Sequence, residues 1–248
     1  MTEFGNSSDP MSPLDLWNTD IQKGKKQLAV LIDPDKCGQD VLPKLLSHLP
    51  DATTHIFVGG SSVARGVTHD LIVVIKRLVN LPVWIFPGDA EQISPAADAL
   101  LFLSLVSGDN PEYLIRQQER AAAQLQAIDL FTIATGYLLI DGGRDSAVAR
   151  VTKTLPLSLN DPDKIANRAM AALYMGAKSI YLEAGSGAKN PIPATVITRI
   201  KKQTELPLIV GGGLRETQQI ESAWAAGADM VVIGTAIEEI ITNNKIQN

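Results

Sequence analysis

The sequence predicts an α/β protein, a (β/α)8 barrel of the TIM type whose third helix is missing or replaced by an extended segment. Eight short apolar runs alternate with amphipathic stretches from end to end, as in parallel strands joined by covering helices. The chain has 248 residues, and such barrels need about 250. No change of composition marks a linker, so we expect a single domain over residues 14–248, preceded by a flexible tail over residues 1–13.

The eight apolar runs are continuous, as expected for parallel strands that are covered on both faces. We expect strands at Leu28–Ile32, His55–Val58, Pro82–Phe86, Asp98–Val106, Phe131–Ile140, Ser179–Leu182, Leu208–Val210 and Met230–Ile233. The stretches between most of them carry apolar residues at helical spacing. We expect helices at Val41–Leu49, Val67–Val79, Pro111–Gln126, Asp161–Met175, Ala194–Gln203, Glu216–Ala226 and Ala236–Ile241.

The connection between the third and fourth expected strands departs from this pattern. Residues 87–97 read PGDAEQISPAA, and proline inside a helix removes a donor and clashes with the preceding turn. Pro87, Gly88 and Pro95 therefore leave little room for a covering helix. Without that helix, the barrel wall would be open beside these two strands and would leave an apolar slot. The alternative is a shortened loop without a slot.

Composition and charge argue against several classes of function. The net charge of −5 does not fit a general nucleic-acid-binding protein, which usually carries a basic patch. Cys37 is the single cysteine, so an intrachain disulfide is excluded and a reducing compartment fits. No apolar run reaches the roughly 18 residues of a membrane span, and the N-terminus lacks the order of a signal peptide. We therefore expect a cytoplasmic protein with no transmembrane segment and no nucleic-acid partner.

Glycine-rich loops follow the last three expected strands, at the end of the barrel where active sites lie. Gly212-Gly213 would let the backbone approach an anion, and Gly234-Thr235 open a helix whose N–H groups and dipole favour negative charge. Gly185-Ser186-Gly187 can supply a third wall. One such loop could be only a tight turn, whereas three loops on one face indicate a phosphate site.

Two carboxylates end strands on the same face. Glu183 follows the sixth strand beside the predicted phosphate site, where it can bind substrate hydroxyls or take a proton. Asp33 ends the first strand with the short reach of a hard-cation ligand, and Mg²⁺ is usually held by one or two carboxylates plus substrate phosphates and water. Ser61 or Ser62 could add an oxygen. The alternatives are a capping or ion-paired Glu183 and a helix-capping Asp33.

An ordered set of motifs resembles the geranylgeranylglyceryl phosphate synthases of the wider phosphoglycerol prenyltransferase family. The motifs are LIDPDK at residues 31–36, FVGGS at 57–61, PG at 87–88, YLEAGSG at 181–187, GGGLR at 211–215 and GT at 234–235. Single motifs are shared with other phosphate-binding barrels, but the ordered set is specific. The resemblance runs from Leu16 to Glu239, over nearly the whole chain.

This resemblance implies a magnesium-dependent prenyltransferase of phospholipid biosynthesis. It would join geranylgeranyl or a longer polyprenyl diphosphate to the 3-hydroxyl of sn-glycerol 1-phosphate, giving an ether-lipid precursor and diphosphate. Asp33 and Ser61 would hold Mg²⁺, Glu183 would be the base, and a hydrophobic groove at the missing third helix would hold the prenyl chain. Contacts with glycerol phosphate would come from Tyr181, Leu182, Glu183, Ala184, Gly185, Ser186, Gly187, Gly212, Gly213, Gly234 and Thr235.

One position departs from part of the family. Some members carry a phosphate-contacting lysine two residues before the magnesium aspartate, where this chain has Leu31. The chain is thus similar to the subgroup that lacks this lysine. The family contains dimers and hexamers, so the resemblance implies a homo-oligomer, and the subgroup favours the larger assembly.

Two other classes of protein remain as alternatives. One is another phosphate-binding barrel enzyme, such as an isomerase or lyase of sugar or indole phosphates, which would have no use for an open apolar slot. The other is a non-catalytic phosphate- or lipid-binding protein, which would not need Asp33 and a metal.

Overall fold

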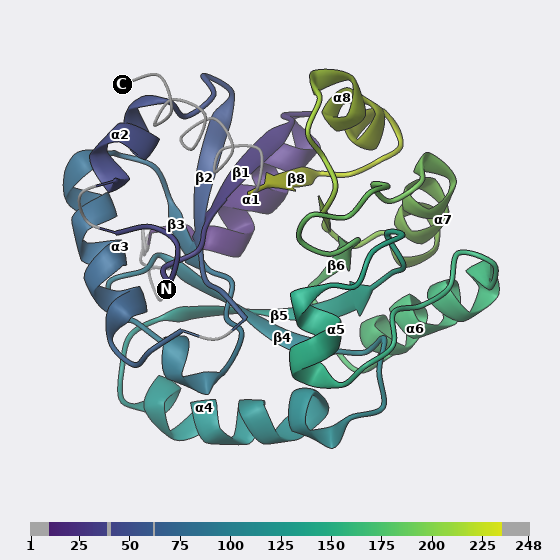
Figure 1. Cartoon of the computed structure of the whole chain (residues 1–248), viewed down its shortest axis with the longest axis horizontal. Coiled ribbons are helices and arrows are strands. Elements are labelled where there is room, and N and C mark those ends of the chain that lie inside the picture. The colour runs from purple at the N-terminus through teal and green to yellow at the C-terminus, as the bar shows by residue number, and fades with distance from the viewer. Residues whose placement is uncertain (1–9, 39–40, 62, 235–248) are drawn as a thin grey trace, which may run out of the picture.

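The computed structural model of the protein describes residues 10–38, 41–61 and 63–234. Within these residues the chain forms a closed barrel of eight parallel strands in sequence order (Figure 1). The strands span Gln27–Ile32 (β1), Thr53–Val58 (β2), Val83–Ile85 (β3), Ala99–Leu105 (β4), Phe131–Leu139 (β5), Ser179–Glu183 (β6), Leu208–Gly211 (β7) and Met230–Ile233 (β8). The predicted barrel and its strands are confirmed.

Helices surround the barrel and cover most of its outer wall (Figure 1). They span Pro13–Gln22 (α1), Leu42–Ser47 (α2), Val67–Leu78 (α3), Gln117–Gln126 (α4), Ala147–Thr152 (α5), Pro162–Tyr174 (α6), Ala194–Thr204 (α7) and Thr217–Ala225 (α8). A π-helical turn at Glu112–Arg116 leads into α4. The sequence pattern predicts neither α1 nor α5. The helix expected at Ala236–Ile241 and residues 1–9 of the expected tail lie outside the described residues.

Helix α1 begins inside the segment that was expected to be a tail. The side chain of Ser12 accepts a hydrogen bond from the backbone N–H of Asp15, and Pro13 occupies the first turn. Both features favour a helix start. Trp17 of α1 is buried and meets Trp84 of β3 edge to face, with ring centres 5.5 Å apart. The helix thereby packs an aromatic side chain into the end of the barrel opposite the C-terminal ends of the strands.

The third connection lacks an α-helix, as predicted. Between β3 and β4 the described chain forms only a 3-10 turn at Ala90–Gln92, capped by the side chain of Asp89. Phe102, on the outward-facing side of β4, is only partly buried because no helix covers it there. The barrel wall is open at this point, and the modified fold with its missing third helix is confirmed.

The core has two apolar layers, as in other barrels of this type. The outer layer lies between strands and helices and includes Val30, Val58 and Ile180. The inner layer fills the barrel and includes Phe57 and Tyr181. Because neighbouring residues of a strand point to opposite faces, each strand ends with one inward side chain at the barrel mouth, and these side chains build the site.

Candidate active site

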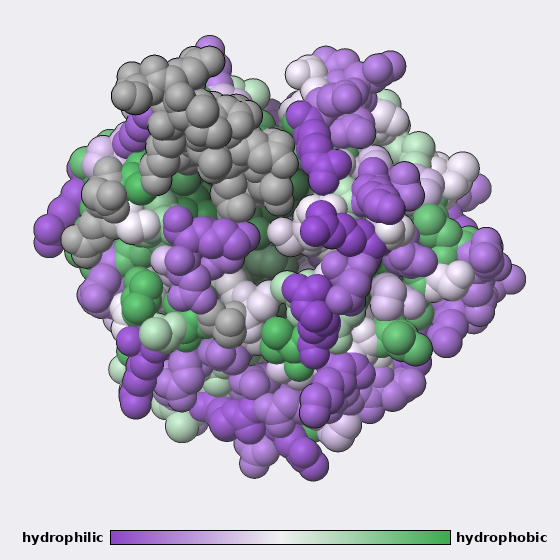
Figure 2. Space-filling view, in the orientation of Figure 1, coloured by the Kyte–Doolittle hydropathy of each residue, from purple (hydrophilic) through white to green (hydrophobic). Residues whose placement is uncertain are grey.

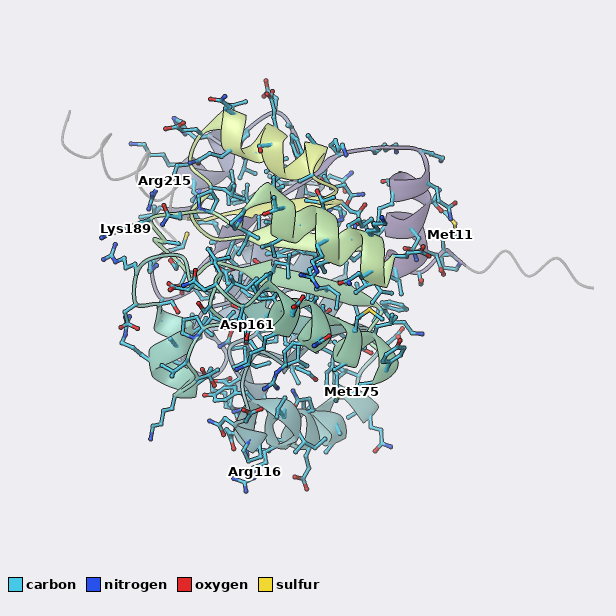
Figure 3. All side chains as sticks on the ribbon, turned by 90° about the vertical axis from the view of Figure 1, so that its right-hand side faces the viewer. Met11, Arg116, Asp161, Met175, Lys189 and Arg215 are labelled. Atoms are coloured by element: carbon cyan, nitrogen blue, oxygen red, sulfur yellow. The ribbon has the colours of Figure 1, made fainter. Side chains whose placement is uncertain are left out.

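The C-terminal ends of the strands meet at one end of the barrel, where Lys189 and Arg215 project, opposite Met11 (Figure 3). A cavity opens at this end and extends to the side chains of β4. The predicted site residues that line it are Asp33, Ser61, Tyr181, Glu183, Ser186, Gly187, Gly212, Gly213 and Gly234. One cavity therefore brings together both carboxylates and all three glycine-rich loops.

Three predicted residues do not line this cavity. Leu182 belongs to the outer hydrophobic layer, as the alternation along β6 requires. Ala184 is buried, and Gly185 contributes a backbone N–H rather than a surface. Thr235 lies outside the described residues. The run from Tyr181 to Gly187 thus divides into residues that face the cavity and residues that shape the loop.

Glu183 is a buried carboxylate at the end of β6, with 7% of its surface exposed. Its Oε1 accepts a hydrogen bond of 2.7 Å from the backbone N–H of Gly185. Its Oε2 and the hydroxyl oxygen of Tyr181 both lie close to Gly211. A Cβ added to that glycine would lie 2.9 Å from Oε2 and 2.5 Å from the hydroxyl oxygen. No basic side chain pairs with Glu183 among the described residues, so the ion-paired alternative is not observed.

The environment of Glu183 shifts its proton affinity. Burial raises the pKa of this carboxyl to about 7, and the hydrogen bond from Gly185 and the neighbouring hydroxyl of Tyr181 oppose the rise only in part. A carboxyl with a pKa near neutrality can accept a proton from a bound hydroxyl at physiological pH. The structure therefore places at the barrel mouth a carboxyl that can exchange a proton near neutral pH.

Two buried tyrosines stand beside this carboxylate. Tyr181 stacks on Phe86 at 4.9 Å between ring centres and meets Tyr137 edge to face at 5.3 Å. Burial raises the pKa of both hydroxyls well above the ordinary value, and the charge of Glu183 adds to the rise. The hydroxyl of Tyr137 has no hydrogen-bond partner in the described part of the chain, whereas that of Tyr181 lies beside the Glu183 carboxylate and interacts with it, without the geometry of a full hydrogen bond. Unsatisfied buried hydroxyls at a cavity indicate that a polar ligand completes their bonding.

Glycine is required where the loops after β6 and β7 touch. Gly212 has a φ of +83°, and a Cβ there would clash with Oε1 of Glu183 and lie 2.7 Å from the backbone nitrogen of Gly185. Gly213 has a φ of +72°, and a Cβ there would lie 3.1 Å from the backbone of Asn190, which is a tight contact. The two loops can close on each other only because these positions lack side chains. Their backbone N–H groups then line a concavity of the kind that binds anions.

Replacing Gly212 by alanine is expected to lower activity at least roughly 100-fold, because the new methyl group displaces the base by a clash. It is also expected to destabilise the fold by about 1–3 kcal/mol, since alanine is strained at positive φ. Transfer rates and urea unfolding measure the two effects. Gly24→Ala is the matched control, because Gly24 has a φ of +71° and open space for a Cβ. If both variants kept native activity, Gly212 would not position the base.

Asp33 lies on the opposite side of the mouth, at the end of β1. Its Oδ1 accepts a 3.1 Å hydrogen bond from the backbone of Asp35, and its Oδ2 lies 3.6 Å from Nζ of Lys36. A Cβ on Gly60 would lie 2.5 Å from Oδ1. The carboxylate therefore rests on the backbone of Gly60, next to Ser61. The bond from Asp35 closes a turn, and helix α2 begins only at Leu42 with Val41 as its N-cap, so the helix-capping alternative for Asp33 is not observed.

Gln92, which the sequence reading missed, fixes this backbone. Its side chain is 1% exposed; its Nε2 donates to the carbonyl of Gly60 at 2.8 Å, and its Oε1 accepts from the N–H of Gly60 at 3.2 Å. The 3-10 turn that replaces the third helix thus holds the loop after β2 in register with Asp33. A glutamine inside a Pro-flanked loop gives no sequence signal for such a contact.

The oxygen donors here suit a hard cation. Asp33 offers a carboxylate and Ser61 a neighbouring hydroxyl, and Mg²⁺ commonly takes one or two carboxylates and fills its other positions with phosphate and water. No cluster of three or more histidine, cysteine or acidic side chains that could bind a metal occurs in residues 10–38, 41–61 and 63–234. The residues therefore fit a cation shared with a phosphorylated substrate rather than one enclosed by protein.

An apolar groove runs from this mouth into the open wall. Its lining comes from the 3-10 segment, from β4, from the helices that follow β4 and from α5. The apolar and aromatic lining residues are Phe86, Ala90, Ile93, Leu100, Leu101, Phe102, Leu103, Tyr113, Ala121, Val148 and Val151. The groove can hold a hydrocarbon chain whose polar end lies between Asp33 and Glu183.

The fold and the site define a class, a (β/α)8 barrel with glycine-rich loops at its mouth and an apolar groove in its wall. Comparison with known proteins agrees. The sequence profile of the PcrB family matches residues 19–248. The chain is 51% identical over 218 residues to the geranylgeranylglyceryl phosphate synthase of Flavobacterium johnsoniae, covering 88% of this chain and 90% of the relative. It is 50% identical over 214 residues to that of Zunongwangia profunda, covering 86% and 92%.

A solved structure is also similar. The (S)-3-O-geranylgeranylglyceryl phosphate synthase of Thermoplasma acidophilum, in complex with its substrate sn-glycerol-1-phosphate, matches with a TM-score of 0.83 and 33% identity over 92% of each chain. The chain therefore belongs to the PcrB family, whose curated relatives are prenyltransferases named geranylgeranylglyceryl phosphate synthase.

Proposed function

We propose that this protein transfers a geranylgeranyl or longer polyprenyl group from its diphosphate to the 3-hydroxyl of sn-glycerol 1-phosphate. The observation that carries the proposal is the position of Glu183, a buried carboxyl with a raised pKa between the glycine-rich loops and an apolar groove. An acceptor with a phosphate and a hydroxyl fits the glycine-rich loops, and a prenyl chain fits the apolar groove.

The acceptor is held by its two ends. Gly187, Gly212, Gly213 and Gly234 all line the cavity, and in this proposal their backbone N–H groups surround the phosphate. The hydroxyl of Tyr181, which lies beside Glu183, would hydrogen-bond the glycerol. The reacting hydroxyl then lies within reach of Glu183.

The transfer step uses this arrangement. The oxygen of the 3-hydroxyl attacks C1 of the prenyl donor and forms the ether bond. The bond from C1 to the diphosphate oxygen breaks, and diphosphate leaves with the electron pair. The hydroxyl proton passes to the carboxylate of Glu183. The groove side chains, Phe86 and Phe102 among them, keep water from the developing allylic cation.

Mg²⁺ is part of the proposal. Asp33 and Ser61 would hold it, and when bound it supplies positive charge that neutralises the departing diphosphate. Lys36 lines the same part of the cavity, where its ammonium group adds positive charge. We also propose a cytoplasmic homo-oligomer, a dimer or a hexamer. Light scattering on the purified protein tests the assembly.

A label-transfer assay tests the function. Purified protein is mixed with labelled sn-glycerol 1-phosphate, geranylgeranyl diphosphate and Mg²⁺, with a parallel sample in EDTA. We expect a butanol-extractable labelled product that is absent with EDTA. If the protein bound glycerol phosphate and yielded no product with donors from C15 to C35, the proposal would be wrong, and an isomerase or lyase of sugar or indole phosphates would become the better hypothesis.

A further inference from the structure

Helix α5 lies on the side of the barrel mouth (Figure 1), and contacts on both of its sides hold it in place. Val148 and Val151 on its inner side line the cavity. On one side, the side chain of Asn110 donates a 2.7 Å hydrogen bond to the carbonyl of Thr152. On the other, Ser146 caps the helix and packs against Gly185. The outer side of α5 is therefore a defined surface at the mouth of the groove.

A large apolar side chain projects from this surface. Leu155 is 87% exposed, the most exposed large hydrophobic residue of the described chain. Its backbone is held in place: the N–H of Thr154 donates to the carbonyl of Ala149 at 3.2 Å, and that of Leu157 to the carbonyl of Leu139 at 2.9 Å. Fixed backbone on both sides holds Leu155 in solvent.

The same segment is basic in an acidic protein. Residues 142–155 contain Arg144, Arg150 and Lys153 but one acidic residue, Asp145, while the whole chain has a net charge of −5. Arg150 pairs with Asp145 at 2.8 Å. Arg144 and Lys153 form no ion pair within the described residues, and both are exposed. Asp141, which precedes the segment, accepts a hydrogen bond from the backbone of Gly143.

The neighbouring loops extend this charge around the mouth. Lys189 and Arg215 project at the same end of the barrel (Figure 3) and have no carboxylate partner within the described part of the chain. Figure 2 shows hydrophilic residues along this side of the central hollow, with apolar residues between them. Unpaired cations around a rigid leucine are the pattern of a surface that binds anionic lipid head groups.

We propose that this edge of the mouth, residues 142–155 with Lys189 and Arg215, docks on an anionic lipid surface. The inference rests on the proposed function, because both the prenyl donor and the product join an anionic head to a long hydrocarbon chain and reside in lipid. None of the helices in the described ranges has the length and hydropathy needed to cross a bilayer. The groove, whose wall includes α5, would then open at the lipid surface where the donor lies.

Vesicle flotation with the full chain tests the surface. Vesicles of phosphatidylglycerol and phosphatidylcholine are compared with vesicles of phosphatidylcholine alone. We expect binding to the anionic vesicles that weakens as salt is raised. The double variant Lys153→Asn, Leu155→Ser removes a cation and the apolar anchor, and asparagine tolerates the φ of +51° at position 153. The partition of this variant into anionic vesicles should fall at least roughly tenfold, and the lost charge alone should account for a factor of about five.

The matched control is Met175→Ser. Met175 is 71% exposed and projects at the other end of the barrel from Lys189 and Arg215 (Figure 3), so its loss should not change the partition. Equal partition of the double variant and the native chain would overturn the proposal. So would a changed oligomeric state of the double variant in light scattering, because a second copy would then cover this face.

Lipid docking and prenyl transfer can be tested separately. Lys153 and Leu155 do not line the cavity, so the double variant should transfer normally from a donor solubilised in detergent and slowly from a donor in anionic vesicles. A double variant that transfers equally fast from both would contradict the docking proposal. A native chain that floats with vesicles and transfers from neither source would overturn the proposed function and leave the lipid surface standing.

Discussion

Replacing Glu183 by glutamine is expected to lower kcat by roughly 10²–10⁴-fold, the contribution of a positioned general base. Glutamine has nearly the same shape, and its amide oxygen can still accept the hydrogen bond that Oε1 takes from Gly185 at 2.7 Å. It cannot take a proton from the acceptor hydroxyl. The rate of label transfer, with both substrates saturating, measures the effect.

The pH dependence gives a second expectation for the same residue. Burial raises the pKa of Glu183 to about 7, and only the ionised form can accept a proton. The kcat/KM of the native protein should therefore rise as pH rises through about 7 and then level off. In the glutamine variant this rise should be absent from the residual activity.

As pH rises, the stability of the native protein should fall while its activity rises. A raised pKa means that the folded state binds the proton more tightly than the unfolded state does, so native stability is highest below the unfolded pKa and falls as pH rises through about 7. Glutamine carries no such charge, and above this range the variant should gain up to about 3 kcal/mol of unfolding free energy. Urea unfolding at pH 8 measures it, with the exposed Glu221→Gln as control. Full activity of Glu183→Gln would remove the base assignment.

The fold was predictable because the barrel leaves a local trace in the sequence. Strands covered on both faces become continuous apolar runs, and all eight were found in this way. The absence of the third helix could be predicted from Pro87 and Pro95, since proline disrupts a helix in any tertiary environment. Both inferences depend on chain neighbours alone.

The helices that were missed show the limit of such patterns. Helix α5 has only six residues, too few for a helical period to stand out. Helix α1 carries a start signal in Ser12 and Pro13, but it lies in a polar segment, and its one buried residue is Trp17. Trp17 is buried because it meets Trp84 of β3, a partner far along the chain.

The site was predictable in its membership but not in its energetics. Glu183 and Gly212 could be named because strand ends gather at one barrel mouth. The rise in the pKa of Glu183 depends on burial by several strands, and the contact of Gly212 with its carboxylate depends on two closed loops. The role of Gln92 depends on a turn that meets Gly60, 32 residues away in the chain. These properties arise only when distant segments pack.

Replacing Asp33 by asparagine is expected to raise the Mg²⁺ concentration for half-maximal transfer at least roughly 100-fold, because a carboxylate ligand of a hard cation is lost. The turn should survive, since the amide oxygen of asparagine can still accept the hydrogen bond from the backbone N–H of Asp35. Titration of the transfer rate with Mg²⁺ measures the shift.

Asp35→Asn provides the control within the same turn. Asp35 is exposed and does not line the cavity, so its variant should keep the native Mg²⁺ dependence. A thermal unfolding experiment gives a readout without turnover: Mg²⁺ with inorganic diphosphate should raise the Tm of the native protein and of Asp35→Asn, but not that of Asp33→Asn. If all three proteins showed the same Mg²⁺ dependence, the carboxylate of Asp33 would serve only the turn, and the cation would have to be held by the substrate phosphates.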